Sequence, residues 1–195
     1  MTIGRPREFD TDQALEAAMR QFWSKGYEAT SLQNLLEVME VSKSSFYETF
    51  GNKHELFEQC LTLYANTLIA SLREELRQAK TGLSFIEKVL NGLIDEASAK
   101  GEKCGCMMVN TTNELAQRDT IIAKLVANGT KSLQGVFEEA VRQGQKEGNI
   151  PLHKTPETLS NYLVSSMVGL KTMVKGGANA TTIKDICEVT LTALK

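Results

Sequence analysis

Apolar side chains recur every three or four positions along almost the whole of this 195-residue sequence. That spacing places them on one face of an α-helix, whereas the two-residue alternation of a half-buried β-strand is nearly absent. A content of 42% hydrophobic residues is enough to build a packed core. The sequence therefore predicts an all-α fold.

Glycines, prolines and capping residues divide this pattern into about nine predicted helices. The first begins after Asp10, an N-cap residue, and ends at Gly26, predicted to be a left-handed C-cap. No flexible linker or internal repeat interrupts the chain, and we divide it into domains at 1–52 and 53–195. The remaining helices are predicted at about 31–39, 43–50, 53–80, 84–100, 107–116, 119–145, 156–174 and 181–194.

The two short helices at 31–39 and 43–50 have the proportions of a helix-turn-helix. Many helical bundles contain two short helices with this spacing, so the spacing alone does not indicate DNA binding. The side chains on the exposed face of the second helix are the more specific evidence. Short hydroxyls can reach base edges or phosphates, and a cation at the next helix start strengthens an anion site. The polar residues in question are Lys43, Ser44, Ser45, Tyr47, Glu48, Thr49 and Lys53.

Charge argues against a strongly basic nucleic-acid binder. The whole chain has a net charge of −2, and residues 1–57 contain six basic and nine acidic residues. Because sequence-independent binding depends on neutralising phosphates, we expect low non-specific affinity for DNA.

The segment TSLQNLLEVMEVSKSSFYETFGNKHELF, residues 30–57, resembles the DNA-binding signature of the TetR family of transcriptional repressors. The resemblance extends back through ALEAAMRQFWSKGYEATS and is weaker over the last 138 residues. It implies a dimeric repressor, released from a palindromic operator by a small-molecule inducer. The implied DNA contacts are Thr30, Ser31, Ser42, Lys43, Ser44, Ser45, Tyr47, Thr49 and Lys53.

Two further features bear on the implied DNA contacts. Thr49 stands where the family often has His or Tyr, so its phosphate contact is expected to be shorter or missing. Arg5 and Arg7 lie in the segment GRPRE, and they fit either a minor-groove arm or an ordinary charged tail.

The last two predicted helices carry apolar stripes that fit either a dimer interface or intrachain core. The resemblance favours a four-helix interface, in which Ser165 and Gly169 would allow close approach. The predicted interface residues are Leu159, Tyr162, Leu163, Ser166, Met167, Leu170, Met173, Ile183, Ile186, Cys187, Thr190 and Leu194.

The middle helices carry apolar, aromatic and methionine side chains that fit either a ligand cavity or plain core. Family likeness favours a cavity with a few polar groups. The predicted lining is Tyr64, Leu68, Phe85, Val89, Leu93, Met107, Met108, Asn110, Thr111, Glu114 and Phe137.

Cys104 and Cys106 lie at the predicted entry to a helix, where the helix dipole and Lys103 could lower a thiol pKa. They fit a sensor of oxidants, electrophiles or a soft metal such as Cu(I), or ordinary packing. A thiol-dependent enzyme is a remote alternative, since neither His54 nor His153 is near them in sequence. We predict no enzymatic activity, no cofactor and no zinc site.

The sequence shows no membrane or export signal. Its longest uncharged run, at 158–170, has 13 residues, fewer than the roughly 20 that span a bilayer. Four scattered cysteines do not form a disulfide framework. We expect a cytoplasmic protein that does not enter the membrane.

Overall fold

The computed structural model describes residues 9–195, and within them it contains nine α-helices and no strand. The predicted all-α fold is confirmed. Over the same residues, no helix is long and apolar enough to cross a membrane. The helices are α1 (Thr11–Lys25), α2 (Leu32–Met39), α3 (Lys43–Phe50), α4 (Lys53–Gln78), α5 (Gly82–Ser98), α6 (Met107–Glu114), α7 (Thr120–Lys146), α8 (Pro156–Lys175) and α9 (Ala180–Thr192).

Capping residues begin the first helices where the sequence predicts. The Asp10 carboxylate accepts hydrogen bonds from the first-turn amides of α1. Ser31 forms a capping box with Asn34, and the Ser42 hydroxyl accepts from the Ser45 amide at 3.1 Å. Each bond satisfies a backbone donor that has no partner within the helix.

The α1 helix ends at Gly26, whose dihedral angles are φ 85° and ψ 171°. The positive φ was expected, but the extended ψ differs from a left-handed helical cap. This region of backbone space is open mainly to glycine, because a Cβ atom there meets its own backbone. The chain consequently leaves α1 in an extended direction and turns toward α6.

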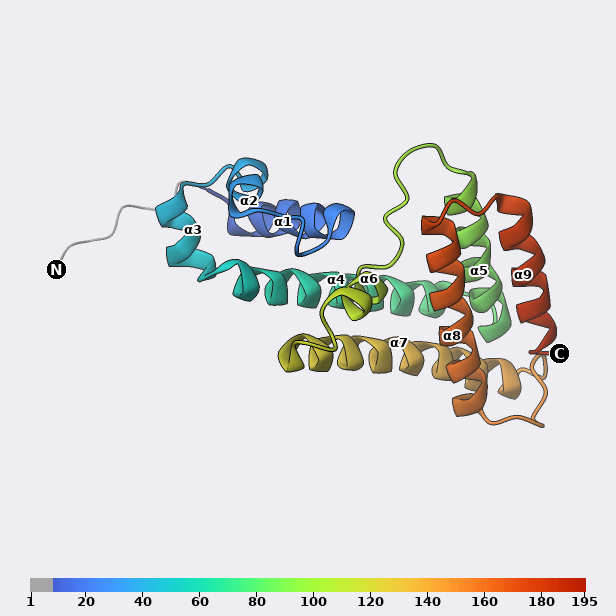
Figure 1. Ribbon diagram of the computed structural model, residues 1–195. Coiled ribbons are helices and arrows are strands. Elements are labelled where there is room, and N and C mark those ends of the chain that lie inside the picture. The colour runs from blue at the N-terminus through green and yellow to red at the C-terminus, as the bar shows by residue number, and fades with distance from the viewer. Residues whose placement is uncertain (1–8) are drawn as a thin grey trace.

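The molecule is elongated, and α4 and α7 run alongside each other through its length (Figure 1). Helices α1–α3 lie at one end, and α5, α8 and α9 lie at the other. The short helix α6 contacts both α4 and α7 between these ends. This arrangement makes α4, α6 and α7 the connections between the two halves.

Two hydrophobic clusters occupy the two ends. One joins α1–α3 to the first half of α4 and also includes Met107 and Met108 of α6 and Ile122 of α7. The other joins the second half of α4 to α5, α7, α8 and α9. Packing is therefore continuous across residue 52, where the sequence predicted a domain boundary, and the boundary itself stays a prediction.

Candidate nucleic-acid interface and ligand pocket

Helix α3 has one buried face and one exposed face. Phe46 and Phe50 are buried beneath it, where their rings lie 6.0 Å apart. Lys43 and Ser44 are exposed, and Tyr47 is 49% exposed. The apolar face packs against α4 and joins the hydrophobic cluster that includes residues of α1 and α2, so the polar face is presented to solvent in one orientation.

The serines at the start of α3 are hydrogen-bonded to one another. The Ser42 hydroxyl lies 3.0 Å from the Ser44 hydroxyl and 2.9 Å from the Ser45 hydroxyl. Ser45 and Thr49 are half-buried, between the two faces of the helix. Because hydroxyls can rotate, this cluster can offer either donors or acceptors to a nucleic acid.

Thr30 requires a correction. Its side chain is fully buried, and its hydroxyl donates to the Gly26 carbonyl at 2.7 Å. The hydroxyl therefore closes the turn between α1 and α2 and is not available to a phosphate. Ser31, one residue later, is exposed and acts as the N-cap of α2.

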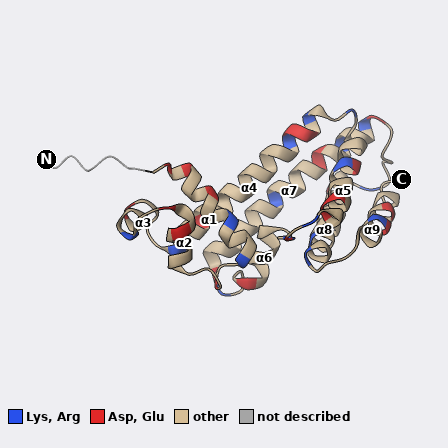
Figure 2. Cartoon of the chain, turned by 90° about the horizontal axis from the view of Figure 1, so that it is seen from above, with Lys and Arg blue, Asp and Glu red and all other residues tan. Residues whose placement is uncertain are grey.

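Lys53 lies at the first position of α4, with its ammonium group 4.2 Å from the centroid of the Tyr27 ring. A cation over an aromatic face is held by electrostatic attraction while its other side remains available to solvent. Acidic and basic residues are interspersed over α1–α3, with no continuous basic stripe among them (Figure 2). Arg5 and Arg7 lie outside the described residues.

Glu114, predicted to line a ligand cavity, instead binds the backbone of the helix-turn-helix end. Its carboxylate accepts from the Tyr27 amide at 3.0 Å and from the Glu28 amide at 2.7 Å. A Cβ atom on Gly26 would lie 3.0 Å from the same carboxylate. The last residue of α6 therefore holds the turn that follows α1.

The segment before α6 makes a second contact with α1. The Trp23 indole donates to the Gly105 carbonyl at 3.2 Å, and its ring packs edge-on against Tyr64 of α4. Glu102 accepts from the Ser24 hydroxyl at 3.1 Å. Sequence analysis missed the two hydrogen bonds, because 78 or more residues separate their partners.

His54 forms a third connection, at the start of α7. Its Nδ1 lies 2.8 Å from a carboxylate oxygen of Glu58, and its Nε2 contacts the carboxylate of Asp119, the N-cap of α7. The hydrogen bond to Asp119 raises the His54 pKa most, and partial burial opposes it. The pKa of Asp119 is lowered, first by its bond from the Ile122 amide and then by His54.

An apolar pocket of about 280 Å³ lies between α4, α6, α7 and α8. We call it the inner pocket. Two of the predicted ligand residues, Leu68 and Met108, line it. Its full lining is Ala65, Leu68, Ile69, Cys106, Met108, Val109, Thr112, Asn113, Gly129, Thr130, Leu133, Val164 and Val168.

The other predicted ligand residues lie elsewhere. Asn110 donates its amide to the Cys104 carbonyl at 2.9 Å. Val89 and Leu93 border a separate surface depression with Leu68, between α4, α5 and α8. Five predicted cavity residues are buried, either in the two clusters or within α6, and we now assign them to the core instead of a cavity. They are Tyr64, Phe85, Met107, Thr111 and Phe137.

The cysteines differ from one another in their surroundings. Cys106 is the N-cap of α6 and faces the inner pocket. Burial, and secondarily Glu102, raises the pKa of Cys104, so the predicted lowering of that pKa is wrong. Lys103 donates to the backbone carbonyls of Ala97 and Ala99 at the end of α5. All four cysteines are free thiols, and burial raises the pKa of both Cys60 and Cys187.

The apolar stripes of α8 and α9 pack mainly within the same chain. We therefore correct the predicted interface, because side chains covered by α5 and α7 are not available to a partner. Ser166 and Ile186 are half-buried, and Ile186 packs against the hydrophobic cluster that joins α4, α5, α7, α8 and α9. The predicted interface residues that are buried are Leu159, Leu163, Met167, Leu170, Ile183, Cys187, Thr190 and Leu194.

A different face of α8 and α9 remains exposed. It includes two predicted residues, Tyr162 and Met173, at 39% and 37% exposed. It also includes Val168 and Val189, at 37% and 67%, which the sequence analysis did not select. Gly169 lies on this face with open space where a Cβ atom would be.

Two curated relatives match this chain over nearly the whole length of both proteins, and both are HTH-type transcriptional regulators. The HTH-type transcriptional repressor ComR of Escherichia coli is 29% identical over 189 residues, which cover 96% of this chain and 90% of ComR. YezE of Bacillus subtilis, an uncharacterized HTH-type transcriptional regulator, is 28% identical over 197 residues, with coverage of 98% and 100%.

Solved structures share the fold. A cysteine-substituted variant of the TetR family regulator CifR, complexed with 26-bp double-strand operator DNA, has a TM-score of 0.84 and 27% identity, covering 98% of this chain and 100% of CifR. Reduced Escherichia coli NemR has a TM-score of 0.84 at 17% identity, covering 92% and 93% of the two chains, and this likeness concerns the fold alone.

Family models match both halves of the chain. The model described as bacterial regulatory proteins of the tetR family matches residues 14–60. The model described as the tetracyclin repressor-like C-terminal domain matches residues 82–188. These matches agree with the helix-turn-helix of α2 and α3 and with the helical half that follows. The chain therefore belongs to the TetR family of bacterial regulatory proteins.

Proposed function

We propose that this regulator is a ligand-responsive repressor, which binds a palindromic operator as a homodimer and leaves it when an inducer occupies the inner pocket. The observation that carries this proposal is the double role of α6. Met108, Val109 and Thr112 of this helix line the pocket, and Glu114 at its end binds the turn after α1. A ligand that displaces α6 therefore acts on the DNA-binding end. As a regulator of chromosomal operators, the protein would work in the cytoplasm.

In this proposal, the exposed face of α3 enters the major groove. Lys43, Ser44 and Tyr47 read or flank the bases, since their side chains are exposed, and the half-buried Ser45 adds a hydroxyl at the edge of that face. The structure of CifR complexed with operator DNA, which shares this fold, supports binding to operator DNA. The proposed phosphate contacts are Ser31, Ser42, Tyr47, Thr49 and Lys53, with Arg5 and Arg7 as further candidates.

A homodimer is needed because one helix-turn-helix makes few base contacts, and two recognition helices about 34–36 Å apart match consecutive turns of DNA. The exposed face of α8 and α9 supports this assembly. Tyr162, Val168, Met173 and Val189 give it apolar contacts, and Gly169 allows a partner helix to approach.

Induction in this scheme is a population shift. The inducer must bind more tightly to a conformation that cannot grip the operator, because equal affinity for both conformations would change nothing. A change in conformation at α6 or α7 would reach the DNA-binding end through two contacts. These are the contact of Glu114 with the turn after α1 and the contact of Asp119 with His54.

Selection of bound fragments from random duplex DNA tests the proposal. The expected product is an inverted repeat whose half-sites are about one helical turn apart. The full-length protein should elute as a dimer in size-exclusion chromatography with light scattering. A monomeric protein that enriches no sequence at low ionic strength would contradict the proposal.

A second candidate input is covalent modification of Cys106. This thiol faces the inner pocket, so a small electrophile that enters the pocket would meet it. The output would be the same release of DNA. Release by an electrophile should be lost in Cys106→Ser and retained in Cys104→Ser, and unchanged release in Cys106→Ser would remove this candidate.

A further inference from the structure

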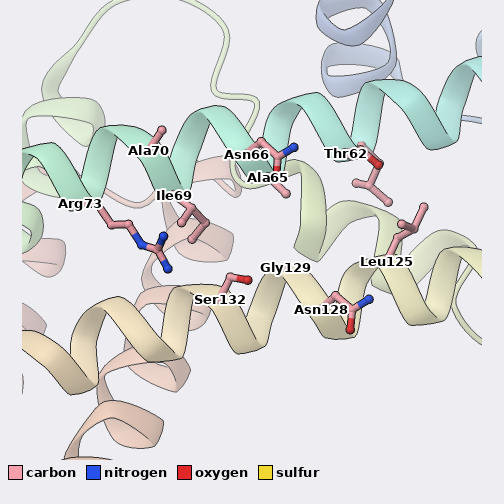
Figure 3. Close-up of a pocket in the computed structure, with 11 residues that line it drawn as sticks. Thr62, Ala65, Asn66, Ile69, Ala70, Arg73, Leu125, Asn128, Gly129 and Ser132 are labelled. Atoms are coloured by element: carbon pink, nitrogen blue, oxygen red, sulfur yellow. The ribbon is translucent and has the colours of Figure 1, made fainter.

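Another cavity lies next to the inner pocket, and all of its lining residues belong to α4 and α7. It measures about 440 Å³, and we call it the outer groove (Figure 3). Its lining contains one cation, two amides and two hydroxyls, and no acidic residue. The lining is Leu61, Thr62, Ala65, Asn66, Ile69, Ala70, Arg73, Leu125, Asn128, Gly129 and Ser132.

The outer groove and the inner pocket meet between α4 and α7. Ala65, Ile69 and Gly129 line both cavities. A Cβ atom on Gly129 would lie 2.2 Å from the terminal methyl carbon of Met108. The flexible end of Met108 thus occupies the space that a side chain at residue 129 would take, at the junction of the two cavities. A methionine side chain can adopt another rotamer at low cost, so the junction can open.

Arg73 gives the outer groove its charge. Its guanidinium group extends from α4 toward α7 and Ser132 (Figure 3). Within residues 9–195, no carboxylate lies within 4.0 Å of it, whereas Arg77, one turn later, is paired with Glu74. A guanidinium presents parallel N–H donors that match the two oxygens of a carboxylate. Ser132 lies nearest to it among the polar lining residues, and Asn66 and Asn128 offer further donors farther along the groove (Figure 3).

We propose that the two cavities bind one ligand, an amphipathic carboxylate. Its apolar chain occupies the inner pocket, and Arg73 holds its carboxylate in the outer groove. The chain would displace the end of Met108, a residue of α6. Binding of this ligand can be measured without DNA. Only its effect on operator release rests on the function proposed above.

The test uses isothermal titration calorimetry of the full-length protein with hexanoate, octanoate, decanoate and 1-decanol. Affinity should rise with chain length, up to about fourfold for each methylene that becomes fully buried. Decanoate should bind about fivefold more tightly than 1-decanol, the gain expected from one partly exposed charged pair. Arg73→Gln should remove this difference and leave the dependence on chain length intact.

Arg77→Gln is the matched control, because it removes an arginine of the same helix that lies outside the groove lining. Its decanoate affinity should equal that of the wild type. The proposal is overturned if no carboxylate binds, if affinity is independent of chain length, or if Arg73→Gln binds decanoate as the wild type does. Operator release is measured separately by fluorescence anisotropy. Binding without release would leave this site intact and contradict its role in induction.

Discussion

Replacement of Glu114 by Gln tests the contact between α6 and the DNA-binding end. The carboxylate of Glu114 accepts two backbone hydrogen bonds, at 3.0 and 2.7 Å. A glutamine keeps one acceptor oxygen and turns an N–H donor toward the other amide, so one of the two amides loses its partner. A hydrogen bond to a charged acceptor contributes about 1.5–3 kcal/mol. Partial exposure of this site reduces the expected loss to about 1–2 kcal/mol.

Thermal unfolding measures the loss. For a chain of this size, 1 kcal/mol lowers Tm by about 2–4 °C, so a loss of about 1–2 kcal/mol in Glu114→Gln should lower Tm by about 2–8 °C. Amide hydrogen exchange should report the same change locally, with faster exchange at Tyr27 and Glu28. Both readouts refer to the free protein and need neither operator nor inducer.

Glu102→Gln is the control for this experiment. Glu102 also connects the two halves, through Ser24 and through Lys25 at 3.7 Å, but its side chain is 60% exposed. An exposed pair contributes about 0.5 kcal/mol or less, so its Tm should stay within about 2 °C of the wild type. If Glu114→Gln behaved in the same way, the Glu114 contact would have no part in joining α6 to the turn after α1.

Three further predictions concern other parts of the molecule. Because the folded-state pKa of His54 is raised, its contribution to stability is complete below the unfolded value of 6.5 and is lost as pH rises through the folded value. His54→Gln should therefore lower Tm more at about pH 6 than at about pH 9, and an equal effect at both would exclude this linkage. Lys53→Ala should weaken operator binding across sequences and reduce the slope of log affinity against log salt by about two for the dimer, or about one per subunit, and an unchanged slope would show that Lys53 does not contact phosphate. Val189→Glu should shift the protein toward monomer in analytical ultracentrifugation, whereas Ile121→Glu, an equivalent change at an exposed residue of α7, should not. A fully dimeric Val189→Glu protein would place the interface elsewhere.

The helix-turn-helix was predictable because its determinants are local. The Ser31 and Ser42 caps, the short turn between α2 and α3, and the buried Phe46 and Phe50 are set by neighbours within a few residues. The structure contains each of them. Thr30 was misplaced, since a hydroxyl at a helix start looks the same in sequence whether it faces solvent or closes a turn.

The ligand pocket and the dimer face were predicted less well for a common reason. Helical spacing identifies the apolar side of a helix, but not the element that covers it. Leu163 and Leu170 were assigned to a partner subunit and are covered by their own chain. Phe85 and Phe137 were assigned to a cavity and pack against each other, with ring centroids 6.0 Å apart.

The amino-acid sequence by itself determined where the helices begin and end to within about two residues, which side of each is apolar, and that α3 has a polar face with Lys43, Ser44 and Tyr47. These properties depend on side chains within one or two turns of each other. The tertiary structure alone decided that Glu114 holds the Tyr27 amide, 87 residues away, and that Asp119 binds His54, 65 residues away. It also decided that Arg73 borders a groove between α4 and α7. Such contacts arise only when packing brings distant segments together, and no local pattern records them.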